Sequence, residues 1–328
     1  MVGSLALVIG LTTLGLTIIL TLFTGMSFNL IIPIMLIFFL GQWYFGPRLV
    51  EKSMKVEEAS KDKYPKLHET VEQISQRSGI EKPEVMISKM DMPNAFAYGN
   101  FLTERKVAVT EGLLKTLEYE EVEAVLGHEL GHIKHKDSEI MMFLSILPAI
   151  FMMIGRMMLW STLFGGGRRE EGGGTIPLIA IGAFSMIFYF LLNLGVMWSS
   201  RIREFYADEH AAKTVQDGSR KLSEGLAKIN ESMAKMKQSN KGRKSRRSRS
   251  SSRNNSNPMG LTPFGSGLKP LFISDPDTAS PLGGKSDQEI VRKYRNKELS
   301  TGEKIFELFS THPNISKRLQ ALKDLSIY

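Results

Sequence analysis

The sequence predicts a mainly α-helical integral membrane protein with four transmembrane helices and a cytoplasmic α+β domain. Three observations lead to this fold class. Four long segments of the 328-residue chain are almost free of charged side chains, two polar regions lie between and after them, and apolar residues in one polar region recur at helical spacing. A helix that spans a bilayer needs about 20 mostly apolar residues, and the four segments have about that length.

The first two apolar segments cover residues 2–23 and 28–45, and the first charged side chain of the protein is Arg48. The four residues between them, 24–27, predict a tight transmembrane hairpin over 1–47. A cleaved signal peptide is the competing interpretation. It is disfavoured because no basic residue precedes the first segment and a second span follows immediately.

The other two apolar segments, 140–164 and 175–200, predict a second transmembrane hairpin over 139–200, with Arg156 as the one charge inside them. The glycine-rich turn that joins them lacks the Gly-Lys-Ser/Thr of a phosphate-binding loop, so it predicts no nucleotide site. A pair of buried core helices is the alternative. The length and the lack of charge favour helices that span the membrane.

The distribution of Lys and Arg predicts the orientation in the cell membrane. Six of these residues lie between positions 48 and 66, whereas the loop of the first hairpin has none. Basic residues are enriched in short cytoplasmic flanks. We therefore expect both termini and the two polar regions, 48–138 and 201–328, on the cytoplasmic side, where they form the two parts of one domain.

Composition limits the chemistry and the partners. The chain has no Cys, which excludes disulfides, thiolate zinc ligands and a cysteine nucleophile. The net charge is +8, but residues 232–274 contain ten Lys or Arg and no Asp or Glu, which leaves +8 − 10 = −2 for the rest. We expect a disordered, solvated insertion over 235–284. Attraction to anionic lipids is the functional alternative, and no specific nucleic acid is expected, because no aromatic residues interleave with the charges.

A metal-binding motif lies at the end of the first polar region. His128-Glu-Leu-Gly-His132 falls in a segment with helical apolar spacing. Two histidines four residues apart project from one face of a helix and can occupy two corners of a zinc tetrahedron. Glu129 is placed to take a proton from the attacking water and pass it to the leaving amine. This is the H-E-x-x-H pattern of zinc metalloproteases, and a solvated helical face is the alternative.

A catalytic zinc site needs a third protein ligand. A metzincin would have Gly at 135 and His at 138, where this chain has His135 and Ser138. Glu204 and Asp208, four residues apart just after the fourth apolar segment, are the fitting pair. Glu204 is the predicted ligand, and Asp208 is predicted to accept the second ring N–H of a ligating histidine. An ordinary helical charge pair is the alternative. An antiparallel hairpin would bring these groups together around one Zn²⁺ per chain.

These residues resemble the HtpX-type membrane zinc endopeptidases, which belong to the same broad group as the CAAX prenyl proteases. The resemblance extends along most of the chain through the motifs Asn94-Ala-Phe-Ala-Tyr-Gly99, Val107-Ala-Val-Thr-Glu-Gly-Leu-Leu114, His128-Glu-Leu-Gly-His-Ile-Lys-His-Lys-Asp137, Arg203-Glu-Phe-Tyr-Ala-Asp208 and Ser310-Thr-His-Pro313 with Arg318. It implies a Glu-zincin fold at the cytoplasmic face, zinc ligands at His128, His132 and Glu204, and Glu129 as the base.

The resemblance also gives meaning to two further segments. Asn94, Ala95, Phe96 and Ala97 resemble the edge strand that pairs with the substrate backbone in such enzymes; a plain surface turn is the alternative. His312 is placed to stabilise the oxyanion of a tetrahedral intermediate; a role in starting the following helix is equally open.

The predicted function is that of a membrane-bound zinc metalloendopeptidase. The resemblance implies quality control of misfolded or damaged membrane proteins, often under stress, with unfolded or membrane proteins as substrates and the lipid bilayer as surroundings. A CAAX-type processing peptidase is the runner-up, although that family encloses its site with more than four transmembrane helices. A membrane scaffold with a non-catalytic zinc site is the alternative outside enzymes.

Overall fold

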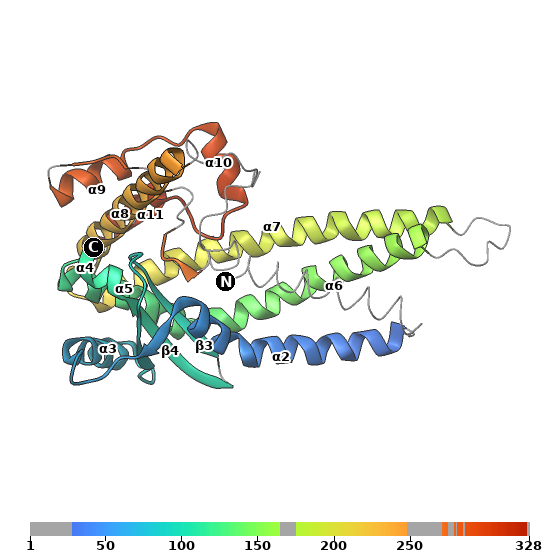
Figure 1. Ribbon diagram of the computed structural model, residues 1–328, viewed down its shortest axis with the longest axis horizontal. Helices are drawn as coiled ribbons and strands as arrows, with labels where there is room; N and C mark the ends of the chain where they lie inside the picture. The colour runs from blue at the N-terminus through green and yellow to red at the C-terminus, as the bar shows by residue number, and fades with distance from the viewer. Residues whose placement is uncertain are drawn as a thin grey trace.

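The computed structural model describes residues 28–100, 102–164, 175–247, 271–274, 279, 281–284 and 286–326 (Figure 1). Its helices are α2 (Phe28–Met54), α3 (Pro65–Ser78), α4 (Glu111–Thr116), α5 (Tyr119–Lys134), α6 (Asp137–Phe164), α7 (Thr175–Thr214), α8 (Gly218–Arg247), α9 (Asp287–Arg295), α10 (Thr301–Leu308) and α11 (Ile315–Leu325). Its strands are β1 (Val56–Glu58), β2 (Glu84–Ser88), β3 (Ala95–Asn100) and β4 (Thr103–Thr110). The mainly helical fold class with a small sheet is confirmed.

The predicted apolar segments are helical wherever the structure describes them. The second lies in α2, the third in α6 and the fourth in α7, while the first, 2–23, lies outside the described residues. Among the described helices, Asp137–Trp160 and Leu178–Thr214 are long and apolar enough to cross a membrane. Figure 1 shows α6 and α7 side by side, and the stacked rings of Phe151 and Phe188 lie 5.3 Å apart between them.

The four strands form one sheet in the order β1-β2-β4-β3. β1 pairs antiparallel with β2, β2 parallel with β4, and β3 antiparallel with β4, with Ala97 opposite Val107. β3 is therefore an edge strand. Its outer edge faces α5, and there the backbone N–H of Ala97 donates to Glu129 of the H-E-x-x-H motif.

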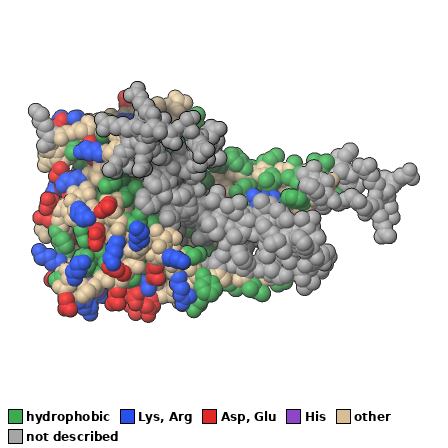
Figure 2. All heavy atoms as spheres, in the orientation of Figure 1, with side chains coloured by type: hydrophobic (Ala, Val, Ile, Leu, Met, Phe, Trp, Pro, Cys, Tyr) green, Lys and Arg blue, Asp and Glu red, His purple; other side chains and the backbone are tan. Residues whose placement is uncertain are grey.

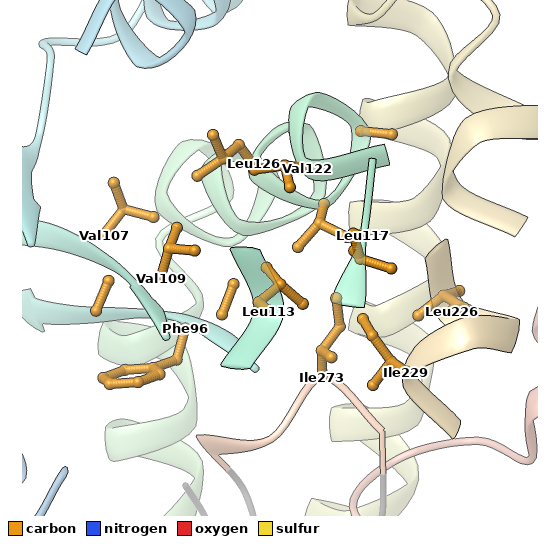
Figure 3. Packing of buried hydrophobic residues seen from close by; sticks show 14 of the residues in the cluster. Phe96, Val107, Val109, Leu113, Leu117, Val122, Leu126, Leu226, Ile229 and Ile273 are labelled. Atoms are coloured by element: carbon orange, nitrogen blue, oxygen red, sulfur yellow. The ribbon is translucent and has the colours of Figure 1, made fainter. Parts of the chain in front are cut away.

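The main core lies between the sheet, α5 and α8. Figure 3 shows Val107 and Val109 of β4 facing Val122 and Leu126 of α5, and these side chains are almost fully buried. Ile273, which follows the long basic segment, also points into this core (Figure 3). Burial of this apolar surface fixes α5 against the sheet.

Close packing of α5 on α7 brings the two halves of the site together. A Cβ atom on Gly131 would lie 3.1 Å from Cα of Ala207, and one on Gly127 would lie 2.9 Å from a methyl group of Val215. The two glycines are one helical turn apart and form a flat strip against α7. The expectation that Gly131 admits a neighbouring segment agrees with this contact.

The expected disorder of 235–284 is wrong in two places. Helix α8 continues through Arg247. Its earlier turns are held by the buried side chains of Leu226, Ile229 and Met233, and the Lys, Met, Gln and Arg residues that follow favour helix. Residues 271–274 are buried rather than solvated, since Leu271, Phe272 and Ile273 are apolar and their backbone has partners in the domain. Residues 248–270 lie outside the described part of the chain.

The surface divides into two regions. Figure 2 shows Lys, Arg, Asp and Glu side chains gathered on the domain, whereas the described side chains along the elongated end are mainly hydrophobic. On α7, the exposed fractions are 57% for Phe184, 59% for Ile187 and 50% for Phe190. Large apolar side chains this exposed along a long helix are typical of a surface that contacts lipid or protein.

Candidate metal centre

Helix α5 carries the predicted metal-binding motif through the middle of the domain. At its start the backbone N–H of Glu118 donates to the carboxylate of Glu121 at 2.8 Å, and the same carboxylate lies 2.8 Å from Nζ of Lys228 on α8. The first turn is thus fixed by a cap and by a buried ion pair. His128 and Glu129 follow near the buried centre of the helix, with 1% and 4% of their surface exposed.

The structure brings the three predicted ligands together. Nε2 of His128 and Nε2 of His132 lie 3.2 Å apart, with their ring planes at 87°. The carboxylate oxygens of Glu204 lie 3.7 Å from Nε2 of His128 and 3.7 Å from Nε2 of His132. Among the described residues, these three form the group able to hold a metal ion, with all ligand atoms within 4.8 Å of one another.

The geometry and chemistry of this group fit zinc. With Zn–N and Zn–O bonds of about 2.0–2.1 Å, ligand atoms at the corners of a tetrahedron lie roughly 3.4 Å apart, close to the three distances found here. Oε2 of Glu204 is buried and accepts no hydrogen bond, although Nη1 of Arg318 lies 3.2 Å from it. A buried carboxylate oxygen that accepts no hydrogen bond is costly, and a cation between the imidazoles would stabilise it further. Two nitrogens and one oxygen, with a fourth position open, are a typical catalytic set.

Asp208 contacts the Nδ1 side of the His128 ring. Its Oδ1 lies 2.9 Å from Nδ1 of His128, which leaves Nε2 facing Glu204; that Asp208 fixes the tautomer of a ligating histidine stays a prediction. The guanidinium of Arg318 donates to both oxygens of Asp208, from Nη2 at 2.6 Å and from Nε at 2.9 Å. Nη1 of Arg318 also lies 3.2 Å from Oε2 of Glu204. Burial lowers the pKa of His128, and the nearby charge of Arg318 lowers it further, which favours the neutral ligating form.

Asp137 contacts the second histidine of the motif. Its Oδ2 lies 2.6 Å from Nδ1 of His132, and its other oxygen accepts a hydrogen bond from Arg203 of α7. Lys136 adopts a left-handed conformation with φ of 54°, which turns the chain between α5 and α6 and returns Asp137 to the histidine. Burial opposes a charge on His132, but the Asp137 hydrogen bond and the Glu204 carboxylate outweigh it and raise the pKa of His132 to about 9.

Glu129 lies between the metal-ligand group and the edge strand. Its Oε2 accepts a hydrogen bond from the backbone N–H of Ala97 at 2.9 Å. Burial raises the pKa of Glu129 to about 7. A carboxyl group with a pKa near the working pH can both accept and return a proton, which is the chemistry that a peptidase base needs.

His312 reaches the same place from the segment before α11. Its Nδ1 lies 3.1 Å from Oε1 of Glu204, and both ring nitrogens are buried without a hydrogen-bond partner. The side chain lines a pocket of about 90 Å³ together with His128, Glu129 and Glu204. His312 is therefore placed beside the ligand group, and its predicted oxyanion role stays a prediction.

The predicted substrate-binding residues, Asn94–Ala97, already contact another segment of the same chain, residues 271–273. The side-chain amide of Asn94 donates to the carbonyl of Leu271 at 2.7 Å, and its oxygen accepts from the N–H of Ile273 at 2.9 Å. Arg318 donates to the carbonyl of Ile273 at 2.7 Å. Leu271, Phe272 and Ile273 thereby line the pocket opposite α5. The backbone N–H of Ala97 faces the site; that Asn94–Ala97 bind substrate stays a prediction.

The sequence analysis did not predict the roles of three parts of the site. Asp137 and Arg318 were named only within motifs and were given no role. Residues 271–273 were assigned to a flexible region. Asp137 carried a local signal, because it follows the histidine helix within two turns. Arg318 and Ile273 carried none, since only the tertiary fold brings them to Asp208 and Asn94.

A helix with two histidines and a glutamate, a third acidic ligand from a second helix, and an edge strand beside the glutamate define a metalloprotease. The sequence profile of peptidase family M48 matches residues 61–326. The protease HtpX homologue of Aeropyrum pernix is 34% identical over 304 residues, which cover 92% of this chain and 88% of that protein. The homologue from Thermoplasma acidophilum is 31% identical over 300 residues, which cover 90% and 85%.

A solved structure has the same fold. The crystal structure of S. mikatae Ste24p matches with a TM-score of 0.56 at 15% identity, and the match covers 97% of this chain and 64% of that chain. Taken with the sequence relatives, these matches confirm the predicted family. The chain belongs to peptidase family M48 and is of the HtpX type.

Proposed function

We propose that this peptidase is a zinc-dependent, membrane-embedded endopeptidase that cleaves misfolded or damaged membrane proteins at the cytoplasmic surface. One observation carries the proposal. His128, His132 and Glu204 converge from two helices on one point, and Glu129 joins that point to the N–H of Ala97 on the free edge of the sheet. A metal, a base and a peptide-binding edge thus meet within one pocket.

His128, His132 and Glu204 would hold the zinc, which supplies a Lewis acid and lowers the pKa of water when it is bound. Glu129 takes the proton of the attacking water and passes it to the leaving amine. His312, beside Glu204, donates to the oxygen that becomes negative as the carbonyl is attacked. Asp208 and Asp137 keep the two ligating imidazoles in the required tautomer and orientation.

The substrate backbone adds to the outer edge of β3. Because β3 pairs only with β4 among the described strands, no described strand covers its outer edge, where the N–H of Ala97 donates to Glu129, and an extended peptide can pair along this edge. Binding through the backbone requires little of the substrate's side-chain sequence. Unfolded segments can bind in this way, whereas a folded protein does not expose an unpaired extended segment.

The membrane placement follows from the long apolar helices. Two described helices have the required length and composition, and α2 continues the second predicted span. With 1–47 and 139–200 as two hairpins, most Lys and Arg in the flanks lie on one side, with Arg168 and Arg169 in the loop on the other side. The active site is then at the cytoplasmic surface of a four-span protein, where misassembled membrane proteins expose unfolded segments.

Metal content measured together with cleavage tests the proposal. Wild type, Glu129→Ala and the control Glu120→Gln are purified in detergent under chelation, given zinc and assayed on casein. Glu120 lies on the same helix with 69% of its side chain exposed. We expect about one zinc in all three and cleavage in wild type and the control only.

Other results separate the alternatives. Zinc in every variant and no cleavage in any would favour a scaffold or a narrow processing enzyme, and cleavage of a prenylated peptide alone would favour the latter. Failure of the wild type to bind zinc would overturn the ligand assignment.

A further inference from the structure

Helix α10 has an unusual orientation on the domain: its apolar side faces outward. The helix begins with a capping box, in which Ser300 N–H donates to Glu303 at 2.9 Å. Four large apolar side chains at its end are about half exposed, namely Ile305 (55%), Phe306 (53%), Leu308 (51%) and Phe309 (50%). A helix on a water-soluble domain normally packs its apolar side inward.

The polar side of α10 is the side that the protein covers. Glu307 is buried, with 9% of its surface exposed. Its carboxylate accepts from Lys317 at 2.6 Å and from the N–H of Asn314 at 3.1 Å. Glu303 is paired with Lys297 at 2.6 Å. The charges therefore attach α10 to the domain, and the apolar side chains are left pointing away.

Helix α10 is also attached to α7 where the apolar part of that helix ends. Nη1 of Arg201 donates to the carbonyls of Glu307 at 2.9 Å and of Ser310 at 2.8 Å. About three helical turns before Arg201 on α7, the rings of Phe309 and Phe190 lie 6.3 Å apart. In Figure 1, α10 lies at the junction between the domain and the long helices.

The exposed side of α10 continues the apolar surface of α7. Phe190 and Leu191 are 50% and 55% exposed, and Trp198, nearer to Arg201, is 61% exposed. If the apolar part of α7 crosses a bilayer, the helix that touches both Phe190 and Arg201 lies at the level of the lipid headgroups and the outer acyl chains. A short helix with one apolar and one charged side is suited to that depth.

We propose that α10 lies in the membrane interface, with Ile305, Phe306, Leu308 and Phe309 in lipid. This inference rests on the proposed membrane placement. It also specifies the substrate, because Leu308 is only four residues before His312, which lies against Glu204. Anchoring α10 holds the active site at the lipid surface, so the site acts on chain segments that have just left the bilayer.

Spin labels on single cysteines test this proposal. The chain has no Cys, so Ile305→Cys, Phe306→Cys, Glu120→Cys and Ile187→Cys each give one labelled site in the full chain. Glu120 is the water-exposed control, because it lies at the start of α5 in the domain with 69% of its side chain exposed. Ile187, 59% exposed on α7, reports whether the protein is inserted. The labelled proteins are reconstituted in phosphatidylcholine–phosphatidylglycerol vesicles, and collision with oxygen, which concentrates in lipid, is compared with collision with a water-soluble nickel complex.

We expect labels at 305, 306 and 187 to collide more with oxygen, and the label at 120 to collide more with the nickel complex. If 187 is in lipid but 305 and 306 meet only the nickel complex, the α10 proposal is wrong and the membrane placement stands. If 305 and 306 are shielded from both reagents, protein covers α10, for example a second copy, and the proposal is also wrong. If 187 meets the nickel complex, the membrane placement itself fails.

Discussion

Arg318 and Asp208 lie 110 residues apart in the sequence and form a buried ion pair with two hydrogen bonds, at 2.6 and 2.9 Å. Asp208 also holds His128, and Arg318 also contacts Glu204 and the carbonyl of Ile273. One guanidinium thus joins two helices, the candidate metal ligands and the segment that lines the pocket. Helix α11 is therefore part of the candidate metal centre, although none of the three candidate ligands lies on it.

Replacing Arg318 should weaken both the fold and the metal centre. Arg318→Ala leaves the buried carboxylate of Asp208 without its partner, which typically costs about 3–5 kcal/mol. We expect a large fall in melting temperature in detergent. Arg318→Lys keeps the charge but loses the bidentate hydrogen bonding to Asp208, so its melting temperature should lie between those of Arg318→Ala and wild type. Equal stability of all three proteins would show that the pair has no structural role.

Removing the Asp137 carboxylate should lower zinc affinity. A group that orients a ligating histidine typically contributes about 10–100-fold to metal affinity. We expect Asp137→Ala to show a loss of that order in competition with a chelator, and Asp137→Asn, which can still accept the N–H of His132, to lose less. Glu120→Gln on α5, the helix that carries His132, serves as control. Unchanged affinity in Asp137→Ala would contradict the role.

A side chain at Gly131 should push α5 and α7 apart. In Gly131→Val, the new Cβ would lie 3.1 Å from Cα of Ala207, and overpacking of this kind costs about 1–3 kcal/mol. Because Glu204 lies on the displaced helix, zinc affinity should fall together with thermal stability. Gly195→Val on α7 is the matched control, since nothing lies within 4 Å of a Cβ there. Similar behaviour of the two variants would rule out the close contact as the cause.

Substituting Asn94 should release the segment that lines the pocket. Asn94→Asp keeps the acceptor for Ile273 but replaces the donor to Leu271 with a charge facing a carbonyl oxygen, and this site is fully buried. We expect faster amide hydrogen exchange in residues 271–274, measured by mass spectrometry. Asn100→Asp makes the same change at the other end of β3, where the side chain contacts Trp43 instead. Exchange at 271–274 that does not differ between the two variants would argue against the Asn94 contact.

Local patterns predicted much of the site. The spacing of His128 and His132 places them on one helical face, and the structure shows them 3.2 Å apart. Glu204 and Asp208 were found by the same reasoning on a second helix. The long apolar segments predicted α6 and α7 because a helix hides its backbone polar groups while it exposes apolar side chains.

The expected disorder of the basic segment was partly wrong for a physical reason. Composition averages over a window, and the window around 271–274 is rich in Gly, Ser and Pro. Three apolar residues within it are enough to hold a buried position once Asn94 and Arg318 supply partners for their backbone. No local pattern shows that such partners exist.

By itself, the sequence determined which residues can bind a metal and which segments are apolar, because both depend on residue type and short-range spacing. Only the tertiary structure decided that Glu204 meets the histidines, that Arg318 and Asp137 support them, and that α10 turns its apolar side outward. Those relationships join residues tens to hundreds of positions apart, and they depend on how closely the helices pack. The flat strip at Gly127 and Gly131 sets that distance between α5 and α7.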